Sequence, residues 1–94
     1  MNTTLIQKNY TATVDDYYIG VDSTSSVTIT LPECEDGKQY IIKSEMKPPL
    51  LNRHIKIVSS DDSKFDGYSE FIISVSHGSV TLIRHRGNWF VCKS

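Results

Sequence analysis

The sequence lacks any catalytic signature, has only two cysteines, contains no long apolar run and carries no excess of one charge sign. No nucleophile-elbow or triad motif orders its serines and histidines, which predicts a protein that is not an enzyme and needs no cofactor. The net charge is -1, the basic residues are scattered, and no glycine-rich phosphate loop is present. These absences argue against binding to nucleotides, nucleic acid or an anionic membrane surface. No apolar run approaches the roughly 18 residues of a membrane-spanning helix.

The two cysteines, Cys34 and Cys92, are far apart in the sequence and form no Cys-x-x-Cys pair. A zinc site would need more ligands at close spacing. The N-terminal stretch lacks the basic start and long apolar core of a signal peptide, so we expect synthesis in a reducing cytosol. We therefore predict two reduced, mostly buried thiols.

Acidic pairs and histidines are the remaining metal candidates. Asp15-Asp16 and Asp61-Asp62 carry the oxygen ligands that calcium prefers, but neither pair has the spacing of a known calcium loop. His85 lies between two arginines that repel a cation, and we expect it on the surface. We therefore expect no bound metal.

Period-2 alternation recurs along the chain, and no window shows helical periodicity. In "VTITL" the apolar side chains of residues 27, 29 and 31 share one face, and Pro32 then ends the strand. Such strands, about 8–12 residues apart, predict an all-β domain: a small antiparallel sandwich or barrel of about eight strands. The expected strands lie in "YTATV", "DYYIGVD", "VTITL", "KQYIIKS", "HIKIVSS", "SEFIISVS", "SVTLIRHR" and "WFVCK".

Glycines mark the expected turns. Asp36-Gly37, Asp66-Gly67 and His77-Gly78 each carry residues typical of tight turns. Gly87-Asn88 is expected as the two-residue turn of the last hairpin. Gly20 lies inside an apolar stretch, where we predict a bulge or a bend.

The chain of 94 residues is long enough for one domain. We assign residues 10–94 to one β-sandwich domain and residues 1–9 to an N-terminal arm. No linker and no clear internal repeat are visible.

Several expected strands are apolar on both faces. Ile41, for example, opposes Tyr40 and Ile42. A domain this small, without disulfides or metal, often depends on partner subunits, so we predict a subunit interface on the outer strand faces. Barrel corners and isolated exposed residues are the alternatives, and the aromatic side chains could also stack on a sugar. The candidate interface residues are Tyr17, Tyr18, Ile41, Ile72, Ile83 and Phe90.

Three stretches carry a family resemblance: "YTATVDDYYIGVDSTSSVTITLP", "GKQYIIKS" and "GSVTLIRHRGNWFV". Together they resemble a small β-rich domain of viral and phage fibre proteins, either tail fibres or fibre heads. The resemblance covers most of the chain from about Tyr10 onward. It implies a homotrimer at the tip or joint of a fibre, within a virion and made in the host cytoplasm. One departure is "EMKPPLLNRHIKI", which replaces the Gly/Asn-rich loop expected there.

Together with the absence of catalytic motifs, the resemblance implies a non-enzymatic virion structural protein, either a trimeric fibre-head or a surface, vertex or capsid component. It would present loops for host attachment or fibre anchoring. Its expected partners are its own copies, other virion proteins, and a host surface receptor or glycan. Two alternatives remain open: a monomeric module that binds a glycan or peptide at a sheet edge, and an internal virion assembly or scaffold protein. The candidate binding-loop residues are Lys47, Leu50, Asn52, Asp62 and Lys64.

Overall fold

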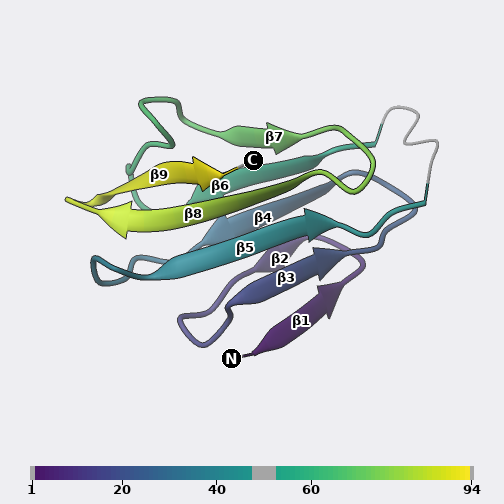
Figure 1. Cartoon of the computed structure of the whole chain (residues 1–94), viewed down its shortest axis with the longest axis horizontal. Coiled ribbons are helices and arrows are strands. Elements are labelled where there is room, and N and C mark those ends of the chain that lie inside the picture. The colour runs from purple at the N-terminus through teal and green to yellow at the C-terminus, as the bar shows by residue number, and fades with distance from the viewer. Residues whose placement is uncertain (1, 48–52, 94) are drawn as a thin grey trace.

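The computed structural model describes residues 2–47 and 53–93, which form nine strands in two sheets and contain no helix (Figure 1). Sheet A has the strand order β1-β3-β5-β8-β9, and sheet B has the order β2-β4-β6-β7. The prediction of an all-β chain is confirmed. In chain order the strands are β1 Thr3–Ile6, β2 Tyr10–Thr11, β3 Tyr18–Val21, β4 Val27–Leu31, β5 Gln39–Ser44, β6 Ile55–Ser59, β7 Phe71–Ile73, β8 Ser79–His85 and β9 Asn88–Lys93.

The first six strands alternate between the two sheets, so the chain winds through three successive coils (Figure 1). Within each sheet these strands pair in parallel: β1 with β3, β3 with β5, β2 with β4, and β4 with β6. The chain then reverses, and β7, β8 and β9 add antiparallel pairs to β6, β5 and β8. The predicted all-antiparallel pairing is therefore wrong. Side chains alternate with period 2 in both kinds of sheet, so alternation alone does not distinguish them.

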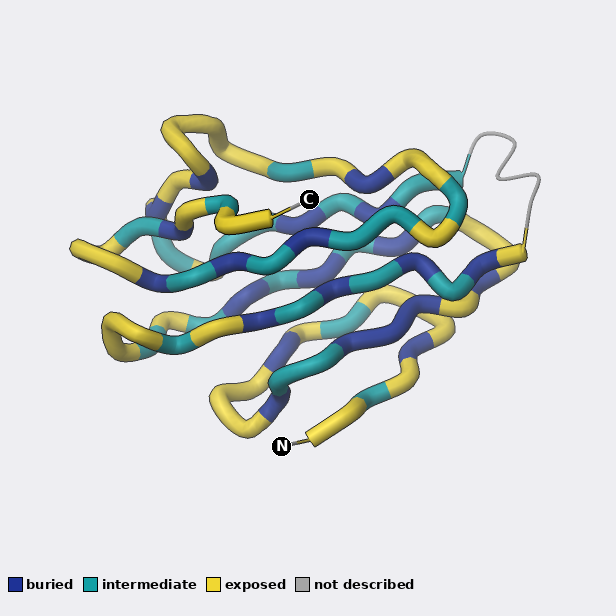
Figure 2. Tube along the Cα trace, in the orientation of Figure 1, coloured by how far each residue is buried: buried dark blue, intermediate teal, exposed yellow. Residues whose placement is uncertain are grey.

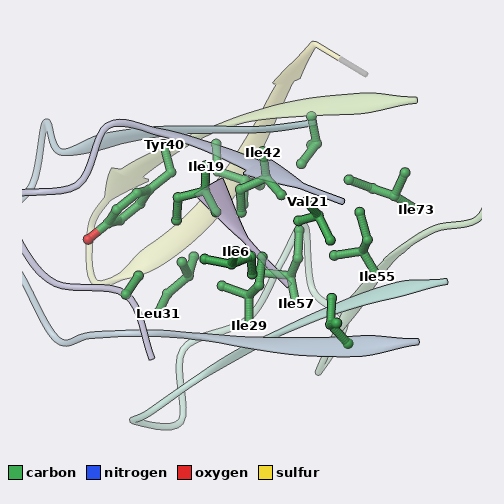
Figure 3. Close-up of a cluster of buried hydrophobic side chains, with 14 of the residues drawn as sticks. Ile6, Ile19, Val21, Ile29, Leu31, Tyr40, Ile42, Ile55, Ile57 and Ile73 are labelled. Carbon is green, nitrogen blue, oxygen red and sulfur yellow. The ribbon is translucent and has the colours of Figure 1, made fainter. Parts of the chain in front are cut away.

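Inward side chains of both sheets form one hydrophobic core (Figure 3). Buried and less buried residues alternate along the central strands (Figure 2). The inward side chains of neighbouring coils stack on one another. In sheet B, Tyr10, Ile29 and Ile57 lie side by side across β2, β4 and β6. In sheet A, Ile19 lies beside Ile42 in the same way.

The coils are a structural repeat that the sequence did not reveal. Strands β1, β3 and β5 begin at residues 3, 18 and 39. Their unequal spacing leaves no fixed period to detect, because loops of different length separate similar strands.

Residues 1–9, expected to form an arm, instead contain β1, which is an edge strand of sheet A. The backbone N–H of Tyr18 donates to the carbonyl of Asn2 at 3.1 Å, and that of Asp22 donates to the carbonyl of Ile6 at 3.0 Å. Ile6 is buried in the core. The hydroxyl of Thr4 donates to Asp16, so both inward side chains of β1 attach the segment to the first coil.

Most of the predicted turns and the strand stop at Pro32 are confirmed. Strand β4 ends at Leu31. Asp66 and Gly67 both have positive φ, 50° and 91°, and His77 turns with a φ of 59°. Gly37 likewise has a φ of 95°.

The last hairpin turns one residue earlier than predicted. Arg86 and Gly87 occupy the two positive-φ positions, with φ of 53° and 77°, and His85 pairs with Asn88. Such a turn needs positive φ at both central residues. The carboxylate of Asp36, from the neighbouring turn, accepts the N–H of Arg86 at 2.9 Å and of Gly87 at 3.3 Å, which holds this tip in place.

Gly20 does not form the bulge that was one of its two predicted roles. The registers of β3 with β1 and with β5 run unbroken through it, and the one shift among the described strand pairs lies between Thr81 and Leu82. Gly20 provides space instead: a side chain there would meet the carboxylate of Glu45. That carboxylate accepts the hydroxyl of Tyr18 at 2.5 Å, which raises the pKa of Tyr18 to about 12.

A matched pair of valines tests the placement of the core. Val21 is fully buried in β3, whereas Val75 is 67% exposed. We expect Val21→Ala to lower the free energy of unfolding by about 2 kcal/mol, from lost burial and a small cavity. We expect Val75→Ala to change it by less than about 0.5 kcal/mol. Urea denaturation measures both, and equal effects would contradict the described core.

Candidate functional site

Four of the predicted interface residues share the outward side of sheet A: Tyr18, Ile41, Ile83 and Phe90. We call them the outer apolar face. Tyr18 pairs with Ile41 across β3 and β5, and Ile83 pairs with Phe90 across β8 and β9. Phe90 is 40% exposed and the other three are half-buried. The face spans four neighbouring strands, so sheet A is apolar on both sides along this band.

The strand register joins the two halves of this face. Ile41 lies opposite Thr81, and Ile83 lies opposite Gln39, so the two isoleucines are diagonal neighbours on β5 and β8. The ring of His85 lies 6.0 Å from that of Phe90 and borders the face. Diagonal neighbours on a sheet lie within reach of large side chains. The four residues can therefore contact one partner surface together.

The other two predicted interface residues lie apart from this face. Ile72 is in β7 of sheet B, opposite Lys56, and is 45% exposed. Tyr17 precedes β3 and is half-buried, and its carbonyl accepts the N–H of Ile41 at 2.8 Å. One flat partner surface cannot cover Ile72 and the outer apolar face at once, because they belong to different sheets.

The binding-loop candidates that the structure describes lie at opposite ends of the strands (Figure 1). Lys47 is exposed and follows β5, whereas Asp62 and Lys64 are exposed and follow β6. Leu50 and Asn52 lie outside the described residues. The described loop residues therefore cannot contribute to a single binding surface.

An ion pair between buried Arg84 and partly exposed Asp61 closes the end of the core near the last hairpin. Arg84 is buried on the inward side of β8, and its guanidinium donates to Asp61 at 3.0 Å and to the hydroxyl of Ser63 at 3.0 Å. The guanidinium also lies 5.4 Å from the ring centre of Trp89. Hydrogen bonds from Ser63, followed by those from Arg84, lower the pKa of Asp61 to about 2.

Sequence reasoning missed this pair. It read Arg84 only as a cation beside His85, and Asp61 as part of a weak calcium candidate. Alternation was the available signal, because Arg84 continues the inward series of Val80 and Leu82. The partners that neutralise Arg84 come from a loop that no periodicity links to β8.

A buried carboxylate, that of Asp16, holds the first coil together. It accepts the hydroxyl of Tyr10 at 2.6 Å, the hydroxyl of Thr4 at 2.7 Å and the N–H of Thr13 at 2.9 Å. Burial alone would raise the pKa of Asp16, but these donors outweigh it and lower that pKa. The same contact raises the pKa of Tyr10 to about 12. The carboxylates of Asp16 and Asp61 thus both accept hydrogen bonds from groups of their own chain.

A hollow of about 470 Å³ lies beside Cys34 and Lys38, with Val14, Glu35 and Asp36 completing its lining. Cys34 is a free, half-buried thiol, and burial raises its pKa. A thiol that holds its proton is a poor nucleophile, so the hollow shows no activated cysteine. Cys92 is also free but exposed, so the prediction that both thiols are mostly buried is wrong for Cys92.

Across residues 2–47 and 53–93, no three His, Cys, Asp or Glu side chains gather as metal ligands. The same residues include no helix able to cross a membrane.

Comparison of the chain with protein-family models and with curated proteins found no match.

The Arg84–Asp61 pair predicts a specific loss of stability in acid. The pKa of Asp61 is about 2 in the folded protein, below the value near 3.9 of an unfolded chain. The unfolded state therefore binds more protons than the folded state between these two pH values. The ionised Asp61 carboxylate stabilises the folded protein above about pH 4, and this contribution is lost as the pH falls toward about 2.

We expect Asp61→Asn to lower the free energy of unfolding by about 3 kcal/mol at pH 7, because Arg84 stays buried without its counter-charge. The variant should also lose stability less steeply between about pH 4 and 2 than the wild type does. Asp62→Asn, at the exposed neighbour, is the control and should match the wild type. Denaturant unfolding at several pH values measures both, and parallel curves for Asp61→Asn and the wild type would contradict the pairing.

Proposed function

We propose that this chain is a non-enzymatic structural protein that assembles with copies of itself through the outer apolar face. The supporting observation is the row Tyr18, Ile41, Ile83 and Phe90 on the outward side of a sheet whose inward side already forms the core. Contiguous apolar side chains that stay at least partly exposed mark interaction sites more often than scattered ones do. A short chain gains most from burying such a face against another subunit.

The finer proposal is a homotrimeric virion component, with each subunit a two-sheet sandwich at a fibre head, vertex or surface. Its support is the resemblance that covers the chain from Tyr10 onward. The loop positions fit a joint, because Lys47 lies at one end of the strands and Asp62 and Lys64 lie at the other. One end would anchor the subunit while the other faces the host. Three copies of a weak contact then bind with increased avidity.

A second candidate is a monomeric module that binds an extended peptide at a sheet edge. The observation in its favour is β1, an edge strand of sheet A with an exposed leucine at its centre. Peptide strands add to such edges through backbone hydrogen bonds. A monomer that binds peptides would separate this candidate from self-assembly.

Light scattering on a sizing column tests the assembly. We expect the particle to be a multiple of three chains of 10.6 kDa. Ile41→Thr should weaken association at least about tenfold, because it puts a hydroxyl into the contact. Ile72→Thr makes the same change on sheet B and should leave the mass unchanged. A wild-type particle of one chain would contradict the proposal.

A further inference from the structure

The four sheet edges differ in how they are protected against further pairing. Sheet B ends in β2 and β7, which have two and three residues, and short edge strands offer little to pair with. The other edge of sheet A, β9, carries Lys93 and pairs with β8 through a register shift. Strand β1, Thr3–Ile6, has four residues with no charge, proline or register shift, and Leu5 at its centre is 60% exposed. Among the described edges, β1 is the one without a protective feature.

The backbone of β1 is oriented for a further partner. The carbonyls of Asn2 and Ile6 accept hydrogen bonds from the β3 side, so the even-numbered residues of this strand face β3. In a regular ladder the alternate residues then direct their N–H and C=O groups the opposite way. Thr3 and Leu5 therefore direct theirs to the open edge, beside a groove of about 450 Å³ lined by residues 4–10.

We propose that β1 pairs antiparallel with β1 of a second copy, centred on Leu5, so that sheet A continues from one subunit into the next. In an antiparallel ladder, residues directly opposite each other share a face. Centring on Leu5 places Leu5 opposite Leu5 on the outward side and Thr4 opposite Ile6 on the inward side. Every side chain thus meets one from its own face.

The strand chemistry favours a second copy over an unrelated peptide. The pair is self-complementary under a two-fold axis, as a closed dimer requires. No charge repels its own image in β1, and the nearest charged side chain, Lys8, falls opposite the neutral Asn2. The neighbouring symmetric register, centred on Thr4, would place Leu5 opposite Thr3 and bury less apolar surface. This contact uses a different surface from the outer apolar face, so it adds to the proposed assembly without resting on it.

Charge variants at position 5 test the pairing in the Ile41→Thr background, where the outer apolar face is weakened. There we expect particles of two chains of 10.6 kDa. Leu5→Lys and Leu5→Glu should each give single chains, with dissociation constants raised at least about tenfold, because like charges meet across the axis. Mixing the two variants should restore the two-chain particle. Leu5→Thr, which keeps a neutral strand, should still pair and is the control.

Amide hydrogen exchange gives a second readout at the same residues. The N–H of residue 5 should be protected in the dimer and exchange freely in Leu5→Lys, while those of Thr4 and Ile6, which face β3, stay protected in both. Protection of Thr4 and Ile6 also shows that the variant is folded. Unchanged mass in Leu5→Lys and Leu5→Glu, or a mixture that stays single-chain, would overturn the pairing. If the wild type and Ile41→Thr are both dimers, the proposal for the outer face fails while this one stands.

Discussion

The stacking of inward side chains from one coil onto the next is the constraint on which the structure depends. Each coil contributes one strand to each sheet, and its inward residues are covered by the facing sheet and by the strands of the neighbouring coils. Tyr10, Ile29 and Ile57 form such a series across sheet B. A series of this kind has two ends, and each end must be closed by a different structure or by a partner.

One end is closed within the chain. The reversal into β7, β8 and β9 adds antiparallel strands to the third coil, and Trp89 from the last strand fills the core beneath Arg84. At the other end, the first coil is held by hydrogen bonds from Thr4 and Tyr10 to Asp16. Strand β1 is an edge strand there, so one of its sides has no partner strand within the described chain. The two ends therefore have different physical roles. Together with the apolar outward side of sheet A, the open end gives a small protein two places where copies could meet.

The sequence was informative where the physics is local. Proline at position 32 ends a strand, Asp66-Gly67 turns, and alternating side chains make strands without helices, because each of these depends on neighbouring residues alone. The grouping of Tyr18, Ile41, Ile83 and Phe90 on one side followed from alternation as well. The direction of strand pairing did not follow from alternation, because side chains alternate with the same period in parallel and antiparallel sheets. The burial of Arg84 depends on its contacts with Asp61 and Ser63. The separation of Ile72 from the outer apolar face depends on the pairing of β7 with β6 in sheet B. Contacts between distant segments set both features.

We propose that another copy covers the outward side of sheet A and keeps water away from it in solution. A soluble paramagnetic probe, read at the isoleucine methyl groups by NMR, tests this proposal. The signals of Ile41 and Ile83 should be spared, while the signal of Ile72 should be strongly broadened. Equal broadening of all three would show that water reaches the outward side of both sheets, and would contradict assembly through the outer apolar face.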